Sequence, residues 1–233
     1  MFSRDYKKKH GIFDTPEDVA DFIIKRISVK KNLKILEPGC GSGIFVDLLA
    51  DKLRNIGLKK RDIFSKVIYC FDQQKGSIKR IREKYKISGE NYNIRRSNFF
   101  SNTFFDEQRF DYIIGNPPYG AKLTSDDLDY IKKNPEIFPL KSNESSVLFI
   151  CKAIHLLKEG GKLIFVLPAT LLRVKAYAEL RKFLKEETFL NLLVNLEKKF
   201  KGVGYETIIL EATKKSPKID IPKKITLDRK SVV

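Results

Sequence analysis

The hydrophobic positions of the chain alternate between short apolar runs, which are typical of buried strands, and segments with apolar residues at helical spacing. In the first helical segment, Val19, Ile23 and Ile27 are four residues apart, and Pro16 suits the first position of a helix. This pattern predicts a helix over residues 16–28. The alternation of strands and helices along the rest of the chain predicts an α/β fold.

The later elements follow from the same patterns. We expect further helices over residues 44–55, 74–86, 144–158 and 174–187. We expect strands over residues 33–36, 66–71, 92–95, 110–115, 162–167, 189–196 and 205–212. Gly160 and Gly161 predict the end of the helix that precedes them. Residues 121–142 read as a long polar loop, and the residues after Lys214 read as a loose tail.

Length and composition favour a single domain. With 233 residues and 42% hydrophobic positions, the chain can bury a sizeable core. No apolar run approaches membrane-spanning length, and residues 1–10 lack the apolar segment of a secretory leader. We therefore expect a cytoplasmic protein.

The cysteines and histidines are few and isolated: Cys40, Cys70, Cys151, His10 and His155. Their spacing does not match a zinc site, so we expect no metal and no Cys–His nucleophile pair. His155 lies in a helical segment, and we expect it to be structural.

The charge is strongly positive, because 46 Lys and Arg residues against 29 Asp and Glu residues give a formal net charge of +17. Such an excess suits a polyanionic partner such as a nucleic acid, with binding that weakens as salt is added. A lysine-rich thermophile or a low-GC genome would also give part of this bias.

A glycine-rich loop follows the first predicted strand. The sequence from Glu37 to Gly43 is Glu-Pro-Gly-Cys-Gly-Ser-Gly, and its glycines allow a ligand to approach the backbone closely. The spacing differs from the dinucleotide-binding Gly-x-Gly-x-x-Gly, and no Lys-Ser/Thr pair of a phosphate-binding loop is present. Glu37, directly before the loop, would face a cation better than a phosphate.

Polar residues also follow the next two strands. Asp72 stands where nucleotide-binding units place an acid that accepts hydrogen bonds from ribose hydroxyls. It could equally be the N-cap of the next helix, or serve both purposes. After the third strand, Asn98 could meet the amino group of an adenine while Phe99 packs on the ring. An apolar turn is the alternative there.

The fourth strand leads into Asn116-Pro-Pro-Tyr119. The two prolines stiffen this turn and hold it at the carboxyl end of a strand, where open α/β sheets bind ligands. The side-chain oxygen of Asn116 and the backbone oxygen of Pro117 can both accept hydrogen bonds from one amino group. Tyr119 can lie flat against a planar ring. The turn therefore suits an exocyclic amine on a base, and an ordinary proline turn is the alternative.

Two further segments are candidate substrate contacts. Residues 121–142 interleave lysines with Tyr130 and Phe138, and we expect either a substrate-contacting loop or a solvated insertion. Phe200 lies among lysines between the last two predicted strands. It is a candidate for base stacking, or else an anchor in the core.

Together these motifs resemble the S-adenosylmethionine-dependent amino-methyltransferases. More narrowly, the chain is similar to the gamma-class adenine DNA methyltransferases, which include TaqI-like enzymes and type I modification subunits. The features that carry this resemblance are Gly11-x-Phe-x-Thr15-Pro ahead of the glycine loop, the segment Leu156–Thr170, and Phe200 before the final hairpin. The resemblance covers about residues 8–213.

The resemblance implies a Rossmann-like fold with a seven-stranded, mostly parallel sheet whose last two strands form an antiparallel pair. It implies methyl transfer from S-adenosylmethionine to the amino group of an adenine flipped out of double-stranded DNA. By analogy, the cofactor would be held by Thr15, Glu37, Pro38, Gly39, Cys40, Gly41, Asp72, Gln73, Asn98, Phe99 and Asn116. The catalytic turn would comprise Asn116, Pro117, Pro118 and Tyr119. The target base would lie between Tyr119 and Phe200.

Two departures from the family pattern keep alternatives open. Asn98 stands where many relatives carry Asp, which puts the affinity for the cofactor in question. The second departure concerns target recognition, for which we expect a domain or subunit outside this chain. Within the chain, we expect a catalytic domain over residues 1–214 and a tail over residues 215–233. The resemblance points to a prokaryotic restriction-modification system. The alternatives are an RNA adenine or protein-glutamine methyltransferase, and a catalytically silent nucleic-acid-binding subunit of a modification complex.

Overall fold

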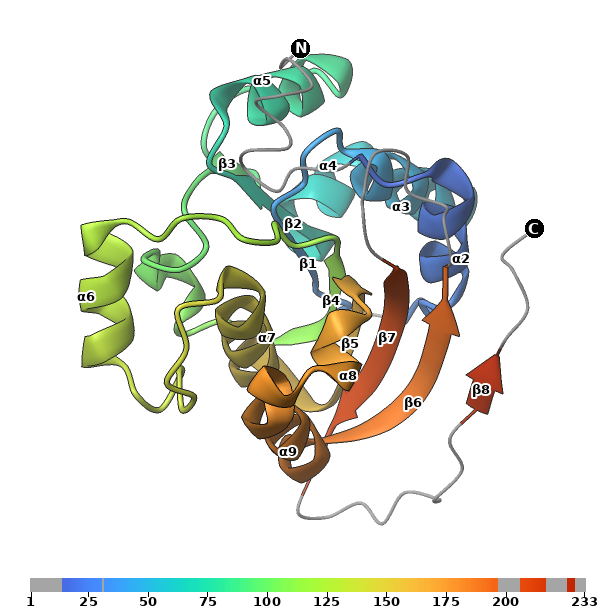
Figure 1. Cartoon of the computed structure of the whole chain (residues 1–233). Coiled ribbons are helices and arrows are strands. Elements are labelled where there is room, and N and C mark those ends of the chain that lie inside the picture. Colours follow the sequence, from blue (N-terminus) through green and yellow to red (C-terminus); the bar gives the residue numbers. More distant parts are fainter. Residues whose placement is uncertain (1–13, 31, 197–205, 217–225, 229–233) are drawn as a thin grey trace.

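The computed structural model describes residues 14–30, 32–196, 206–216 and 226–228, and its centre is one β-sheet (Figure 1). The strand order is β3-β2-β1-β4-β5-β7-β6-β8. The strands are β1 (Ile35–Pro38), β2 (Ile68–Asp72), β3 (Ile94–Arg96), β4 (Phe110–Gly115), β5 (Leu157–Pro168), β6 (Thr188–Asn195), β7 (Thr207–Lys214) and β8 (Thr226–Asp228). The expected seven strands are β1 to β7, so the predicted α/β fold is confirmed.

Strand direction also matches the expectation. Neighbouring strands from β3 to β5 are parallel, whereas β7 runs antiparallel to both β5 and β6. The central strands β1, β2 and β4 are buried along their whole length, as their continuous apolar runs predict. Because these strands are parallel, the loops that follow them meet at one edge of the sheet.

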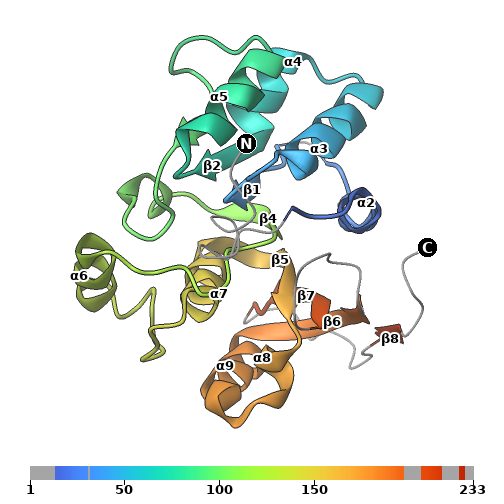
Figure 2. The same cartoon turned by 45° about the horizontal axis from the view of Figure 1, so that its top comes forward.

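Helices cover both faces of the sheet (Figure 2). One face packs against α2 (Glu17–Lys25), α3 (Ile44–Asn55) and α5 (Lys75–Lys84), and the other against α7 (Ser145–Leu156) and α9 (Ala178–Glu187). Shorter elements connect them, namely α4 (Lys60–Asp62), a π-helix (Ile63–Val67), α8 (Thr170–Arg173) and two 3₁₀ turns (Thr103–Phe105 and Lys175–Tyr177). Among the described residues, no helix has the length and apolar character that a membrane span requires.

The predicted end of the helix before Gly160 is wrong. Helix α7 ends at Leu156, and both glycines lie inside β5. Gly160 has φ +72°, and a Cβ on Gly161 would lie 2.9 Å from the carbonyl oxygens of Lys158 and Phe110. The glycines therefore allow two backbones to approach each other where the β4–β5 register shifts, which a C-cap reading does not anticipate.

The expected loop over residues 121–142 contains a helix, α6 (Ser125–Lys133). Thr124 and Asp127 form a capping box, in which each side chain binds the backbone N–H of the other residue. The loop prediction is wrong. The capping residues are visible in the sequence, so the start of this helix could have been predicted from local signals. Figure 1 shows α6 lying to the side of α7.

Part of the expected tail adds to the sheet. The short strand β8 pairs in parallel with β6, with Leu192 opposite Thr226. The outer edge of β6 presents backbone groups that need hydrogen-bond partners, and β8 supplies them.

We expect Gly161→Ala to lower the free energy of unfolding by about 1–3 kcal/mol, because its methyl group would displace packed backbone. Gly76→Ala is the matched control, since Gly76 is exposed on α5 and nothing lies within 4 Å of its added Cβ. That change should be neutral or stabilise the chain by up to about 1 kcal/mol. Urea-induced unfolding measures both, and equal stabilities of the two variants would contradict the close approach at Gly161.

Candidate functional site

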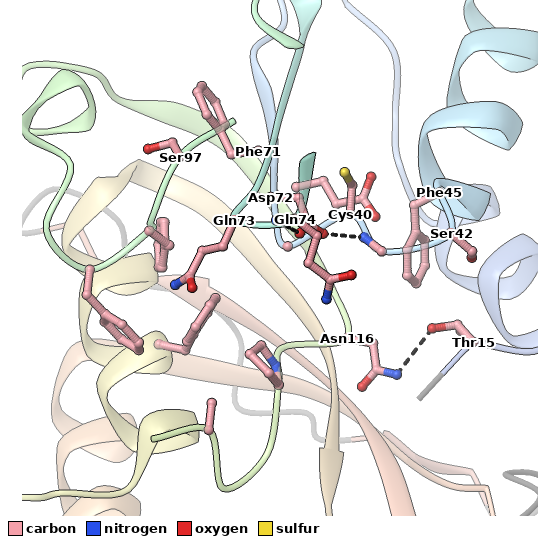
Figure 3. A pocket seen from close by; sticks show the side chains of 18 of the residues that line it. Thr15, Cys40, Ser42, Phe45, Phe71, Asp72, Gln73, Gln74, Ser97 and Asn116 are labelled. Atoms are coloured by element: carbon pink, nitrogen blue, oxygen red, sulfur yellow. Dashed lines mark hydrogen bonds between the residues drawn. The ribbon is translucent and has the colours of Figure 1, made fainter. Parts of the chain in front are cut away.

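A cavity of about 390 Å³ opens at the carboxyl ends of β1, β2 and β4 (Figure 3). It is lined by residues from the segment before α2, from the glycine-rich loop and the start of α3, from the end of β2 and the loops after β2 and β3, from the turn and segment after β4, and from α6 and α7. They are Asp14, Thr15, Glu37, Gly39, Cys40, Gly41, Ser42, Ile44, Phe45, Phe71, Asp72, Gln73, Gln74, Ser97, Phe99, Phe100, Asn116, Pro118, Ala121, Lys122, Asp127 and Phe149.

The glycine-rich loop is fixed to the end of β2. The N–H groups of Gly39 and Cys40 donate to the carbonyl of Phe71 at 2.7 and 3.0 Å. Gly39 and Gly41 have φ values of +106° and +48°, a conformation that favours glycine. The loop therefore passes close to the cavity with only backbone facing it at these positions.

Asp72 links this loop to the start of α5. One carboxylate oxygen accepts from Gly41 N at 2.8 Å and the other from Gln74 N at 2.7 Å. The N-cap of α5 is Gln74, so Asp72 is not the N-cap that the sequence offered as an alternative, although its carboxylate accepts from the N–H of that residue. The side chain of Asp72 lines the cavity, and its contact with a ribose stays a prediction. Burial raises the pKa of Asp72 in spite of these hydrogen bonds.

Glu37 provides a test of which ligand the cavity suits. Its side chain is 4% exposed, and Oε2 has no hydrogen-bond partner among the described residues. Burial, and next the carboxylate of Asp72, raises the pKa of Glu37 well above its usual range. A buried acid without a partner, beside a second acid, suits a ligand with a positively charged group such as an ammonium.

Asn116 points into the cavity from the turn after β4, toward Thr15 (Figure 3). Its Nδ2 donates to Thr15 Oγ1 at 3.2 Å, and its Oδ1 accepts from the hydroxyl of Tyr119. The same hydroxyl lies 2.5 Å from the carbonyl oxygen of Val166 in β5, and one O–H can donate to only one of the two at a time. The amide is therefore oriented by hydrogen bonds at both its nitrogen and its oxygen.

Three phenylalanines form the wall near the end of β3. The ring centroid of Phe149 lies 4.8 Å from that of Phe99 and 4.9 Å from that of Phe100. Asn98 adjoins this wall without lining the cavity. Its Oδ1 accepts from Phe100 N at 2.9 Å, and its Nδ2 donates to Asp127 Oδ1 at 2.6 Å. This end of the cavity suits a flat apolar ring with a polar edge.

Most of the candidate residues come together at this one cavity. Those that line it are Thr15, Glu37, Gly39, Cys40, Gly41, Asp72, Gln73, Phe99, Asn116 and Pro118. Among the described residues, Pro38, Asn98, Pro117 and Tyr119 adjoin the lining residues without belonging to them. Phe200, the candidate for base stacking, lies outside the described residues, so its role stays a prediction.

Several lining residues were not predicted from the sequence. Some of them lie in or near a recognisable motif, and others do not. Ser42 lies within the glycine-rich loop, Phe45 follows it by two residues, and the capping box marks Asp127. Phe149 gave no signal, because it lies inside a helix that is apolar on nearly all sides. Within the described ranges, no group of three or more His, Cys, Asp or Glu side chains could hold a metal ion.

Comparison with known proteins identifies relatives of this chain. The family model described as N-6 DNA Methylase matches residues 1–229. The chain is 30% identical over 232 residues to the type II methyltransferase M.HincII of Haemophilus influenzae, covering 96% of this chain and 41% of that protein.

Two solved structures share the fold. One is the type I restriction-modification methyltransferase subunit of Streptococcus thermophilus, with a TM-score of 0.72 at 19% identity over 90% of this chain and 46% of that one. The other is a Listeria monocytogenes protein assigned to the class I S-adenosylmethionine-dependent methyltransferases, with a TM-score of 0.68 at 20% identity over 91% of this chain and 64% of that one.

The chain spans less than half the length of M.HincII and of the Streptococcus subunit. The family model nevertheless matches almost every residue of it. The chain therefore belongs to the N-6 DNA methylase family.

Proposed function

We propose that this chain is the catalytic part of an adenine-specific DNA methyltransferase, which moves a methyl group from S-adenosylmethionine to the exocyclic amine of an adenine in DNA. The observation that carries the proposal is the position of Asn116, which lines the same cavity as the glycine-rich loop and Glu37. The amide that would bind the target amine thus borders the cavity in which the cofactor would bind.

The residues around the cavity fit the cofactor part by part. Glu37, with its unpartnered oxygen, would hold the ammonium of the methionine end. Asp72 would accept hydrogen bonds from ribose hydroxyls, and the aromatic wall at Phe99 would receive the purine. When bound, S-adenosylmethionine supplies a methyl group on a positively charged sulfur, which is an electrophile.

The turn after β4 would prepare the nucleophile. An amine conjugated to a purine ring attacks poorly, because its lone pair is delocalised into the ring. Asn116 Oδ1 and the carbonyl of Pro117 would each accept one hydrogen of this amine and favour its pyramidal form. Positioning the amine against the methyl group would supply most of the rate acceleration, and no strong general base is required because the proton can leave after transfer.

DNA fits the charge and the chemistry of the chain. The amine of an adenine is out of reach while the base is stacked and paired, so the base must leave the duplex. Aromatic stacking at Tyr119 and Phe200 would offset about 1–3 kcal/mol per ring of that cost. The formal charge of +17 favours a polyanion as the partner.

The proposal is tested by offering the chain labelled S-adenosylmethionine with separate pools of DNA, RNA and protein, followed by digestion and nucleoside analysis. Label in N6-methyldeoxyadenosine supports it. Label in RNA or protein would assign a different substrate, and the absence of any transfer with intact cofactor binding would favour a silent subunit.

We expect Asn116→Ala to lower the rate of methyl transfer at least about 100-fold, because an acceptor that acts on the reacting amine is lost. Cofactor affinity, measured by titration calorimetry, should change by less than about threefold. Tyr119→Phe and Tyr119→Ala are matched variants, of which only the first keeps the ring for stacking. The phenylalanine variant should retain much more activity, and full activity in Asn116→Ala would remove the amide from the mechanism.

We expect the ligand-free Glu37→Gln variant to become more stable relative to the wild type as the pH rises. We also expect the variant to bind the cofactor more weakly. The pKa of Glu37 is raised in the folded state, so the folded chain binds more protons than the unfolded chain between the usual carboxyl pKa and this raised value. Wild-type stability therefore falls as the pH increases through that window, and the variant lacks this contribution. Asp72 contributes to the pH dependence of stability in the wild type and in the variant alike.

Thermal unfolding of both proteins across pH measures this difference. Calorimetry in buffers of different ionisation enthalpy should show that cofactor binding releases a proton from the wild type and less from the variant. A stability difference that does not depend on pH would contradict the buried, protonated state of Glu37.

A further inference from the structure

Asp127 is a buried acid at the cavity that the sequence analysis did not single out. It belongs to the first turn of α6, in a polar segment where most side chains face solvent, yet only 2% of its surface is exposed. It lines the same cavity as Asp72 and Asn116. A carboxylate in such a place requires hydrogen-bond donors, and its partners define what it does.

The two oxygens of Asp127 have different tasks. Oδ2 accepts from Thr124 N at 2.9 Å and from Thr124 Oγ1 at 2.8 Å, which completes the capping box of α6. Oδ1 accepts from Asn98 Nδ2 at 2.6 Å. A carboxylate oxygen has two lone pairs, so Oδ1 retains the capacity to accept one more hydrogen bond.

The surroundings of Asp127 suit a purine. Phe99, Phe100 and Phe149 line the same cavity and pack with centroid distances of 4.8 and 4.9 Å. They offer apolar surface to a flat ring, and Asp127 supplies an acceptor among the lining residues. An amino group at the ring's edge would complement a carboxylate, whereas a carbonyl oxygen would be repelled by it.

Asn98 cannot readily take this role itself. It is not among the described residues that line the cavity, whereas Asp127 is. The Nδ2 of Asn98 donates to Asp127 Oδ1 at 2.6 Å, and its Oδ1 accepts from Phe100 N at 2.9 Å. The amide is instead a brace that orients the carboxylate.

Helix α6 is held in place at a second point. The hydroxyl of Tyr130 donates to Asp106 at 2.8 Å. The fully buried Lys152 of α7 lies 4.6 Å from the centre of the Tyr130 ring and donates to Phe100 O at 2.8 Å. The same lysine therefore contacts both α6 and the loop that carries the phenylalanines, which keeps Asp127 aligned with them.

We propose that Asp127 is the residue that selects a 6-amino purine in the cofactor, by accepting a hydrogen bond from the amine at Oδ1, with Asn98 as its positioning residue. This inference rests on the proposed function, since it assumes that the cavity binds an S-adenosyl compound.

The test compares two ligands that differ at the purine's 6-position. S-Adenosylhomocysteine carries the amine, and S-inosylhomocysteine, its deamination product, carries an oxygen. Titration calorimetry gives the affinity of each for the wild type, for Asp127→Asn and for Thr124→Val. Thr124→Val is the matched control, because it removes a hydroxyl from the same capping box without changing the carboxylate oxygen that binds Asn98.

We expect the wild type to prefer the adenosyl ligand at least about tenfold. Asp127→Asn should lower this preference to about threefold or less, because the introduced carboxamide can also donate to the 6-oxygen. Thr124→Val should keep the wild-type preference even if both affinities fall. Thermal unfolding of each variant shows whether α6 remains folded.

Two results would overturn the inference while leaving the proposed function intact. One is an unchanged preference in Asp127→Asn, and the other is an equal loss of affinity for both ligands, which would indicate a purely structural role. A wild type that binds neither ligand would instead overturn the proposed function together with this inference.

Discussion

The site depends on one set of hydrogen bonds, those that tie the glycine-rich loop to the end of β2. Gly39 and Cys40 bind the carbonyl of Phe71, and Gly41 binds the carboxylate of Asp72. Without these contacts the loop after β1 would not follow the cavity wall between Glu37 and Asp72, which the paired strands β1 and β2 hold at the same cavity. Two buried acids side by side are costly, as their raised pKa values indicate. The arrangement makes physical sense if a cation completes it.

The turn after β4 would bind the target amine, and the segment that follows the turn lines the proposed cofactor site. Asn116 faces the cavity, and the chain then continues into α6, which returns to the cavity at Asp127. Beneath α6, burial lowers the pKa of Lys152 to about 8, while Asp106 acts in the opposite direction. A lysine held there by backbone carbonyls and an aromatic ring links α6, α7 and the loop after β3. The segment first interpreted as a substrate loop therefore also belongs to the proposed cofactor site.

Much of this site could be predicted because its determinants are local in sequence. A strand end followed by glycines, an acid or a stiff proline turn predicts ligand contacts, and parallel strands bring such ends together. The positions of Glu37, Asp72 and Asn116 at one cavity follow from this logic. The predictions were wrong where contacts between segments distant in the sequence determine the local structure. The glycines at 160 and 161 allow close approach of β4 to β5, and β8 depends on the free edge of β6. The contact between Asn98 and Asp127 is of the same kind, because nothing in the sequence indicates that the two side chains meet.

The central claim is that one cavity binds the cofactor while Asn116 at its edge receives the target amine. A crystal structure of the full chain with S-adenosylhomocysteine tests this claim most directly. The account predicts the ligand's ammonium beside Glu37, its ribose hydroxyls at Asp72, its purine against Phe99 and its sulfur facing Asn116. A ligand bound elsewhere, or bound with its sulfur turned away from Asn116, would contradict it.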